Sequence, residues 1–584
     1  KMDFLGLRNL SLMERILNAV KRTNAGKNFD IKQIPMQDHK TLAMLGNGDT
    51  NGIFQFESEG MKNVLKRLKP ERFDDLVAVN ALYRPGPMEN IPTYIKRRHG
   101  EEAVSYLHQD LKEILESTYG IIVYQEQIIQ IASKFAGFSL GQADLLRRAV
   151  SKKKADVLEE QRIYFVEGCL KQGYEKQVAN SIYDYIVKFA NYGFNLSHAV
   201  AYSMIAYQLA YLKAHYPQFF MASLMSSVIG NDVKVSQYVR DLKRMNIPLL
   251  APSINKSGMA FHYEKSGIRY SLAAIKGVGG VSVREIMQAR NDGYFKDLFD
   301  FCLRVSSKAI NRKTLEALVH SGAFDEWGED RATLLASLDV AIDFADIASA
   351  DADLFHNSEF NLTPKYVETE PIPLEMKLQF EKEVLGLYLS SHPISSYKQL
   401  FADFAAHHLY QALEEKDSKF AFGIYVSDLK TIRTKKGEVM AFVKIADESD
   451  EMEAVAFPNV YRQHGVNLQK GNILFVQGYS ETRNNKKQFV IQEVYPITQL
   501  QLLKEEWQQT IFIRVTKEMH TKEHYLQIKN LLQKYPGATR VKIFFEQNNK
   551  TVLVPMWNWV NPSPAFLQLM KNLVGETNVI IREN

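Results

Sequence analysis

The spacing of the hydrophobic residues changes along the chain, and this change restricts the sequence to a multidomain α+β fold. Up to about residue 230 the apolar residues recur at helical spacing, as in Leu111, Ile114 and Leu115, which predicts a mainly helical region. Residues 420–498 instead alternate between apolar and polar positions in five short segments separated by turn residues. Five strands in so short a stretch predict a small Greek-key barrel such as an OB-fold.

The rest of the chain divides by the same criterion. Its 584 residues exceed one domain of ~100–200 residues, so several domains are expected. Residues 501–584 alternate between strand-like and helical patterns, which predicts a small C-terminal α/β domain. Residues 343–373 combine many acidic residues with little apolar periodicity and a single lysine. That composition predicts an acidic, partly disordered linker.

Charge, cysteine content and the N-terminus narrow the functional class. The net charge is only +5, so an anion-binding surface must come from local clusters of cations. Two cysteines, Cys169 and Cys302, exclude a disulfide scaffold and indicate a reducing, cytoplasmic setting. The most apolar stretch, residues 199–230, contains Lys213 and His215, which predicts a buried helix pair and no membrane span. The chain starts without methionine or a signal peptide, so we expect it to derive from a longer one.

A glycine-rich turn predicts a helix-hairpin-helix motif. In Ile275–Gly280, Lys276 precedes Gly277, and Gly279 follows two residues later. The glycines let backbone N–H groups approach a phosphate, and the next helix adds its dipole. Such hairpins grip the duplex backbone without reading its sequence. The alternative is a plain glycine turn between two helices.

Two clusters of cations point to phosphate binding. The first combines Arg147 and Arg148 with Lys152, Lys153 and Lys154. The second contains Lys62, Lys66, Arg67, Lys69 and Arg72. A single cluster of this kind is usually a solvated helix face. Two clusters together with a hairpin and a barrel favour nucleic acid, and arginine forks also suit the oxygens of a triphosphate.

The predicted barrel also combines cations with aromatic residues. Its cations are Arg433, Lys435, Lys436 and Lys444, with Arg483, Lys486 and Lys487 in a later turn, and Arg433, Lys435 and Lys436 are the ones selected as DNA contacts. Its aromatic residues include Phe422, Tyr425, Phe442 and Phe457. Inward-facing aromatic residues belong to the core, so only some of them can stack on bases.

Hydrolase and metal chemistry have weaker support in the sequence. His198 follows a serine, but no Gly-x-Ser-x-Gly elbow is present, so a core or phosphate-contacting role for His198 is favoured. Phosphoryl transfer with two Mg²⁺ ions needs at least two carboxylates. Asp351 and Asp353 lie in the acidic segment, and Asp447–Glu453 is predicted to be a loop. Asp3 stands in an apolar, strand-like setting, with a fraying terminus as the alternative.

Nine segments, in order, resemble the motif series of bacterial DNA polymerase III alpha subunits, the C-family replicases. They are Lys1–Leu7, Thr50–Met61, Ala81–Pro87, Tyr124–Gln127, Leu145–Lys154, Tyr192–Tyr202, Ile275–Gly279, Asn311–Lys313 and Leu385–Leu389. The resemblance covers at least residues 1–500. The order of the hairpin and the barrel is similar to that of the DnaE form.

The resemblance implies roles for individual residues. Asp3 matches the third catalytic aspartate of the palm, a Mg²⁺ ligand. The residues implied in nucleotide binding are Lys1, Arg147, Arg148 and His198. The hairpin region resembles the part of the family that contacts duplex DNA. The residues that we expect to bind DNA, from the cation cluster, the hairpin and the barrel described above, are Lys152, Lys153, Lys154, Lys276, Gly277, Gly279, Arg433, Lys435 and Lys436. Asp351, Asp353, Leu354 and Phe355 resemble the internal clamp-binding peptide, although Asp351 stands where the family pattern favours glutamine.

The resemblance also implies an organisation and a set of partners. The expected segments are 1–9 as the last palm strand, 10–230 as fingers, 231–342 as the helix-hairpin-helix and clamp-binding domain, 343–373 as the acidic linker with the clamp peptide, 374–410 as a helical connector, 411–500 as the OB-fold and 501–584 as the C-terminal α/β domain. The expected partners are primer–template DNA, deoxynucleoside triphosphates, single-stranded template DNA, the sliding clamp and other replisome subunits. No membrane partner is expected.

One absence limits what this chain is expected to do alone. The family's first two palm aspartates and its N-terminal PHP domain are not found in the sequence. The chain is therefore expected to be the C-terminal portion of the polymerase and not to polymerise alone. The alternative hypothesis is a non-catalytic module that binds DNA and tethers the sliding clamp.

Overall fold

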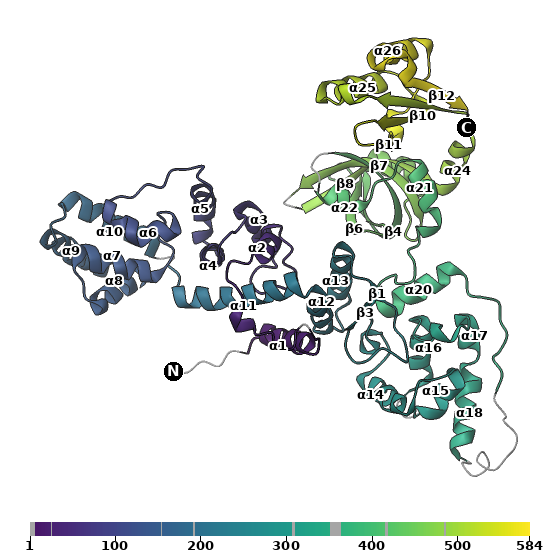
Figure 1. The fold of residues 1–584 in the computed structure, drawn as a ribbon, viewed down its shortest axis with the longest axis horizontal. Helices are drawn as coiled ribbons and strands as arrows, with labels where there is room; N and C mark the ends of the chain where they lie inside the picture. The colour runs from purple at the N-terminus through teal and green to yellow at the C-terminus, as the bar shows by residue number, and fades with distance from the viewer. Residues whose placement is uncertain are drawn as a thin grey trace. The chain divides into compact units, whose positions relative to one another are not determined.

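The computed structural model describes residues 6–24, 26–152, 155–190, 193–306, 310–350, 364–414, 418–483 and 486–583. The chain forms two compact units (Figure 1). The first contains residues 1–242, 246–274 and 278–291, and the second contains residues 243–245, 275–277 and 292–584.

The first unit is mainly helical, as predicted. Its helices are α1 (Arg8–Lys21), α2 (His39–Gly46), α3 (Glu59–Leu68), α4 (Phe73–Leu82), α5 (Ile91–Arg98), α6 (Lys112–Leu115), α7 (Gln125–Ala136), α8 (Leu140–Lys152), α9 (Ala155–Lys171), α10 (Lys176–Ala190), α11 (Leu196–His215), α12 (Pro217–Ser226), α13 (Asp232–Arg244, which runs into the second unit) and α14 (Gly280–Ala289). A small sheet has the order β1-β3-β2, formed by β1 (Leu249–Leu250), β2 (His262–Glu264) and β3 (Gly267–Arg269). Several helices begin at side-chain caps. The Asp38 carboxylate accepts from Thr41 N at 2.8 Å, and the Asn195 amide oxygen accepts from His198 N at 2.9 Å.

Helix α11 is central to this unit and packs on α2, α4 and α12. Lys213 is only 2% exposed, and its ammonium donates to the carbonyls of Asp49 and Asn51 at 2.9 Å each. Burial lowers the pKa of Lys213 to about 8. The predicted buried helix pair is therefore confirmed as α11 and α12. Within the described ranges, no helix is long and apolar enough to span a membrane.

The helices of the second unit lie before, between and among its strands along the chain. They are α15 (Leu298–Arg304), α16 (Arg312–His320), α17 (Arg331–Ala336), α18 (Leu338–Ala350), α20 (Leu374–Leu385), α21 (Lys398–Asp403), α22 (Leu409–Glu414), α23 (Pro458–His464), α24 (Ile497–Glu505), α25 (Lys522–Lys534) and α26 (Pro564–Val574).

The acidic segment is more ordered than predicted at both of its ends. Residues 343–350 belong to α18, so the predicted start of the linker is wrong. Leu338 and Ala341 are fully buried and Ala345 lines an apolar cavity, a helical spacing that the acidic composition obscured. On the other side, the hydroxyl of Tyr366 accepts from Leu298 N at 3.2 Å.

The predicted five-stranded barrel is confirmed. Its strands are β4 (Lys419–Arg433), β5 (Val439–Ala446), β6 (Glu451–Ala456), β7 (Ile473–Arg483) and β8 (Lys486–Pro496). They close in the order β4-β5-β6-β8-β7, with β6 and β8 parallel. Phe422 is fully buried in the barrel core, whereas Phe457 lies outside the strands and precedes α23. The loop predicted for residues 447–453 is wrong in part, because β6 begins at Glu451.

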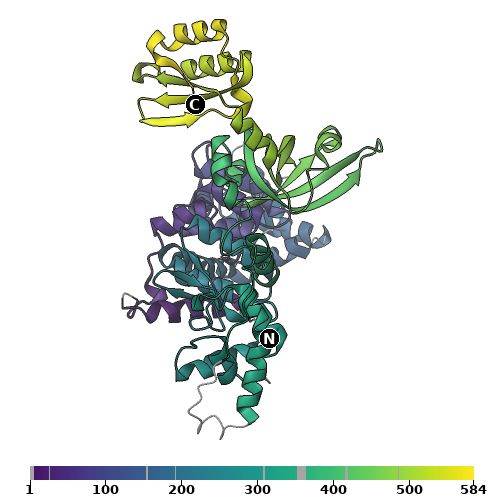
Figure 2. The same ribbon diagram turned by 90° about the vertical axis from the view of Figure 1, so that its right-hand side faces the viewer.

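The C-terminal domain has one layer of helices and one sheet. Its strands β9 (Gln509–Val515), β10 (Pro536–Phe545), β11 (Lys550–Leu553) and β12 (Val579–Glu583) have the order β11-β10-β9-β12. Residues of α25 and α26 share one core with alternate residues of the strands, so both helices cover the same face (Figure 2). The predicted α/β pattern is confirmed.

Candidate nucleotide-binding and DNA-binding sites

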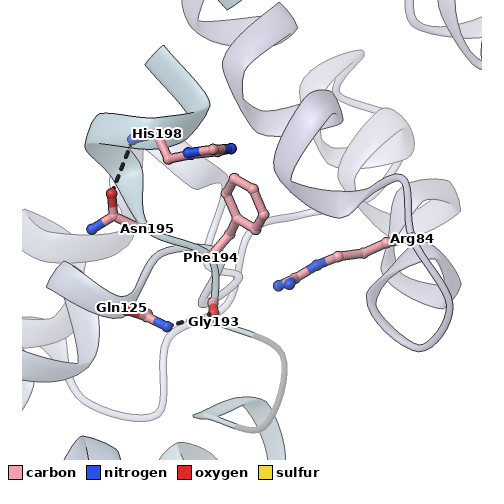
Figure 3. A pocket seen from close by; sticks show the side chains of 6 residues that line it. All are labelled: Arg84, Gln125, Gly193, Phe194, Asn195 and His198. Carbon is pink, nitrogen blue, oxygen red and sulfur yellow. Dashed lines mark hydrogen bonds between the residues drawn. The ribbon is translucent and has the colours of Figure 1, made fainter. Parts of the chain in front are cut away.

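An open pocket of about 390 Å³ lies in the helical unit (Figure 3). It is lined by Arg84, Gln125, Gly193, Phe194, Asn195 and His198. Arg84 follows the end of α4, Gln125 is the first residue of α7, and the other four lie at and before the start of α11. Three segments that are far apart in the sequence therefore meet at one site.

Backbone pairing holds two of these segments together. Tyr124 and Phe194 form a parallel bridge, in which Gln125 N donates to Phe194 O at 2.9 Å and Phe194 N donates to Val123 O at 3.0 Å. The Glu126 carboxylate accepts from Leu196 N at 2.9 Å. These bonds fix the start of α11 against the start of α7, so two of the three segments that line the pocket are held together by the fold itself.

Two arginines place positive charge at the pocket. The guanidinium of Arg84 lies 4.7 Å from the centre of the Phe194 ring, and its Nε donates to Ala81 O at 3.2 Å. Burial lowers the pKa of Arg84, but an arginine stays protonated. Arg147 Nη1 donates to Gln125 Oε1 at 3.0 Å, which brings its charge beside the pocket.

Asp144 orients the predicted nucleotide-binding arginines. Its carboxylate accepts from Arg147 Nε at 2.8 Å and pairs with Arg148 Nε at 2.8 Å. These hydrogen bonds and charges lower the pKa of Asp144. The side chain of Arg148 is 62% exposed, compared with 21% for Arg147. Of the two, Arg147 is the one that reaches a pocket residue.

His198 lies at the mouth of the pocket and is exposed. Its ring stacks on Tyr202 with 4.2 Å between the ring centres, and it meets the Phe194 ring edge-on at 5.4 Å. The core alternative for His198 is therefore wrong, because His198 is exposed and lines the same pocket as Arg84.

Sequence reasoning did not single out Arg84 and Gln125 as site residues. Both lie in segments that carried the family resemblance, and Arg84 stands directly before a Pro-Gly-Pro turn. The sequence feature that could have identified Arg84 is its position beside this turn, because a rigid turn outside a helix can hold the side chain of a neighbouring residue in place for binding.

Several predicted site residues lie outside the described residues. They are Lys1, Asp3, Lys153, Lys154, Asp351, Asp353, Leu354 and Phe355. Lys152 is the last residue of α8. No group of three or more His, Cys, Asp and Glu side chains that could hold a metal ion occurs in the described part of the chain.

The second cation cluster is partly engaged inside the helical unit. Lys62 Nζ donates to Asn51 Oδ1 at 2.7 Å, and Arg72 Nη2 donates to the hydroxyl of Tyr119 at 2.8 Å. These two cations therefore support the fold, which favours a structural role over phosphate binding for that cluster.

The predicted hairpin turn presents its polar residues to solvent. Ile275 and Val278 are buried, whereas Lys276, Gly277 and Gly279 are exposed. A short 3₁₀ turn precedes it and α14 follows it. Gly277 has a φ of +90°, and Thr314 Oγ1 donates to its carbonyl at 3.2 Å.

We expect the two hairpin glycines to respond differently to alanine. Gly277→Ala should cost about 1–3 kcal/mol, because its φ disfavours a side chain and the new Cβ would lie 3.3 Å from the Cβ of Ala317. The matched control Gly279→Ala has a φ of −78° and open space around its Cβ, so it should leave stability unchanged or raise it slightly. Denaturant unfolding of both variants measures the difference; equal losses would contradict it.

The barrel keeps its predicted cations on the surface. Arg433, Lys435 and Lys436 are exposed at the turn between β4 and β5. Of the four predicted aromatic residues, Phe422 is buried, Tyr425 and Phe442 are partly exposed and Phe457 is exposed. Tyr425 also packs against Tyr388 with 5.9 Å between the ring centres.

Comparison with known proteins identifies three of the domains of the chain. A family model described as the finger domain of bacterial DNA polymerase III alpha subunits matches residues 9–173. A helix-hairpin-helix motif matches residues 246–334, and an OB-fold nucleic acid binding domain matches residues 426–497. The DNA polymerase III subunit alpha of Bacillus subtilis (strain 168) is 50% identical over 586 residues, covering 100% of this chain and 52% of that protein.

The chain belongs to the family of DNA polymerase III alpha subunits. The subunit of the same name from Halalkalibacterium halodurans is 44% identical and also covers 100% of the chain and 52% of the relative. The chain thus spans about half the length of the curated relatives that it matches. The finger-domain match includes Arg84, Gln125 and Arg147, so three charged or polar residues around the pocket lie in a segment that this family shares.

Proposed function

We propose that this chain is part of a DNA polymerase III alpha subunit that performs template-directed DNA synthesis in replication, and that the pocket binds the incoming deoxynucleoside triphosphate. The observation that supports this most directly is that Arg84 and Gln125 line the same pocket and that Arg147 hydrogen-bonds to Gln125 from beside it, all in the finger-domain segment. Guanidinium groups bind phosphate oxygens through paired, charge-assisted hydrogen bonds.

The pocket offers complementary groups for the other parts of a nucleotide. His198 and Phe194 present flat ring surfaces, and the amides of Gln125 and Asn195 present hydrogen-bonding groups. We assign Arg84 and Arg147 to phosphate binding and His198 to the mouth of the pocket. Lys1 and Arg148 are assigned to the outer part of the triphosphate, on the resemblance alone.

The DNA would contact three further surfaces. Lys276, Gly277 and Gly279 would hold the duplex through its backbone, and Lys152, Lys153 and Lys154 would add cations along it. The exposed barrel residues Arg433, Lys435 and Lys436 would hold the single-stranded template.

Two further assignments concern residues outside the described part of the chain. Asp3 is proposed as a ligand for Mg²⁺, which in such enzymes stabilises charge on the transferring phosphate. Because Asp3 is not described and the described residues form no metal-holding group, no step of the reaction is assigned to it. Leu354 and Phe355, flanked by Asp351 and Asp353, are proposed as the peptide that binds the sliding clamp and thereby joins the other replisome subunits.

The proposed function is tested by primer extension. We expect residues 1–584 alone to bind primer–template DNA without extending the primer, and we expect extension when the remainder of a homologous alpha subunit is supplied in trans. Extension by the chain alone would contradict the need for partner carboxylates. DNA binding without extension in either case would favour the second candidate, a non-catalytic module that binds DNA and tethers the clamp.

A further inference from the structure

Both helices of the C-terminal domain pack on one face of its sheet, and among the described residues no helix of this domain covers the other face. The residues of β9, β10 and β12 that face the helices are Ile511, Ile513, Val515, Val541, Ile543 and Val579. The alternate residues lie on the other face, which we call the open face. In β9 and β10 they are Thr510, Phe512, Arg514, Arg540, Lys542 and Phe544, and across the sheet they are paired with Thr551, Leu553, Ile580 and Arg582.

The centre of the open face is an aromatic ring between two cations. Lys542 is the direct neighbour of Phe512 on β10, and its ammonium lies 5.6 Å from the ring centre. The guanidinium of Arg582, on β12 at the other side, lies 5.3 Å from the same centre. Ile580, the direct neighbour of Phe512 on β12, is 47% exposed. A partly open ring is therefore flanked by positive charge on both sides.

The charge of this face is one-sided. No acidic residue occupies an open-face position in the four strands, all of which the structure describes. Arg514 pairs with Glu546 at 2.7 Å, at the end of the sheet. Apart from their contacts with the Phe512 ring, the side chains of Lys542 and Arg582 form no ion pair or hydrogen bond with a described residue. Both cations are accessible to solvent, because Arg582 is exposed and Lys542 is partly exposed.

The opposite end of the face is already covered. The guanidinium of Arg540 lies 3.9 Å from the centre of the Trp507 ring, and Trp507 packs against Phe404 and Trp559. The accessible part of the face therefore begins at the row of Lys542, Phe512 and Ile580 and continues to Phe544. Arg582 pairs with Thr510 in the row of Arg540, but its side chain is exposed and its guanidinium lies over the Phe512 ring at the border of this part.

We propose that this end of the open face is a second binding site for single-stranded DNA. An aromatic ring on a sheet offers a stacking platform for one base, and cations on the neighbouring strands can bind the phosphates on either side of it. An acidic protein segment would use the cations but not the ring. The choice of DNA over RNA rests on the proposed function, since the site itself requires only bases and phosphates.

The test measures oligo-dT binding by the full 584-residue chain. Fluorescence anisotropy is recorded in a background in which Arg433, Lys435 and Lys436 are replaced by glutamine, so that the barrel contributes less. In this background Phe512→Leu should raise Kd about fivefold or more, the lower limit for the loss of one stacked base. Lys542→Gln with Arg582→Gln should reduce the slope of log K against log salt by about 1.4, because each contact to a single strand contributes about 0.7.

A matched control removes the same charge from the other side of the domain. Lys522→Gln with Lys529→Gln changes two exposed cations of α25 and should leave both the affinity and the salt slope unchanged. Thermal melting of each variant checks the fold. Because Arg582 and Lys542 are not buried, the charge pair keeps the test valid even if Phe512→Leu lowers the melting temperature.

The outcomes separate this inference from the proposed function. If the barrel substitutions weaken binding while the open-face variants have no more effect than the α25 control, the second site is rejected and the proposed function stands. If neither the barrel substitutions nor the open-face substitutions change binding, both the proposed DNA contact of the barrel and the second site are rejected. The assignment to single-stranded DNA is wrong if an RNA strand of the same length binds the open face more tightly than dT. It is also wrong if polyglutamate displaces dT equally well before and after the Phe512→Leu substitution.

Discussion

Replacing Asp75 with alanine is expected to destabilise the helical unit by about 3–5 kcal/mol. Asp75 lies in the first turn of α4 and is fully buried. Its carboxylate accepts from Glu71 N at 3.1 Å, from Arg72 N at 3.3 Å and from Arg98 Nε at 3.2 Å. Alanine would leave two backbone donors and a largely buried guanidinium without this partner.

Arg98, the cation that pairs with Asp75, also depends on this ion pair for its charge to be stable in a largely buried position. Burial by itself would lower the pKa of Arg98, but hydrogen bonds to Asp75 and Glu71 raise it above its ordinary value. Arg98 ends α5, so the pair joins α4 to α5. The chain between these helices contains Arg84, and the loss of the pair should therefore also loosen the pocket.

The neighbouring residue provides the control for this prediction. Asp74 is in the same turn of α4 but is less buried than Asp75, so Asp74→Ala should cost only about 0.3–1 kcal/mol through the helix dipole. Denaturant unfolding followed by circular dichroism measures both variants. If both variants have equally small effects, Arg98 and the two backbone N–H groups find other partners. The ion pair of Asp75 with Arg98 would then not stabilise the packing of α4 on α5.

Local patterns predicted the fold well where one face of each element is buried. The alternation in residues 420–498 and 509–583 predicted the strands, because side chains of a strand alternate between core and solvent. The pattern was insufficient for residues 343–350, where acidic residues occupy part of α18. There the apolar spacing of Leu338, Ala341 and Ala345 was a better guide than the number of charges.

The candidate site was predicted only in part, for a different reason. The pocket is assembled from segments near residues 84, 125 and 194, and a single backbone bridge between Tyr124 and Phe194 brings two of them together. No local pattern encodes that contact. The sequence predicted Arg147 and His198 from charge clustering and family resemblance, but the meeting of Arg84, Gln125 and His198 at one pocket needed the tertiary structure.

Loss of Arg84 or Arg147 is expected to reduce nucleotide use by the intact polymerase about 10–100-fold in kcat/KM. Each substitution would remove a charge-assisted hydrogen bond between the enzyme and a phosphate of the nucleotide, which contributes about 1.5–3 kcal/mol. Arg84→Ala also removes the cation that lies over Phe194. Arg147→Ala frees Gln125 and Asp144 from their bonds to this side chain. Arg148→Ala should have a smaller effect, because Arg148 is mostly exposed and is held through Asp144.

The measurement must separate a nucleotide contact from a structural role. Steady-state extension at varied nucleotide concentration gives KM and kcat, while anisotropy gives the affinity for primer–template DNA. A nucleotide contact changes kcat/KM and leaves DNA affinity and the melting temperature close to those of the parent. Lys171→Ala removes an exposed cation from α9 and should change neither quantity. If Arg84→Ala and Arg147→Ala lower the melting temperature while kcat/KM for the nucleotide stays within about twofold, the two arginines support the fold and the triphosphate binds elsewhere.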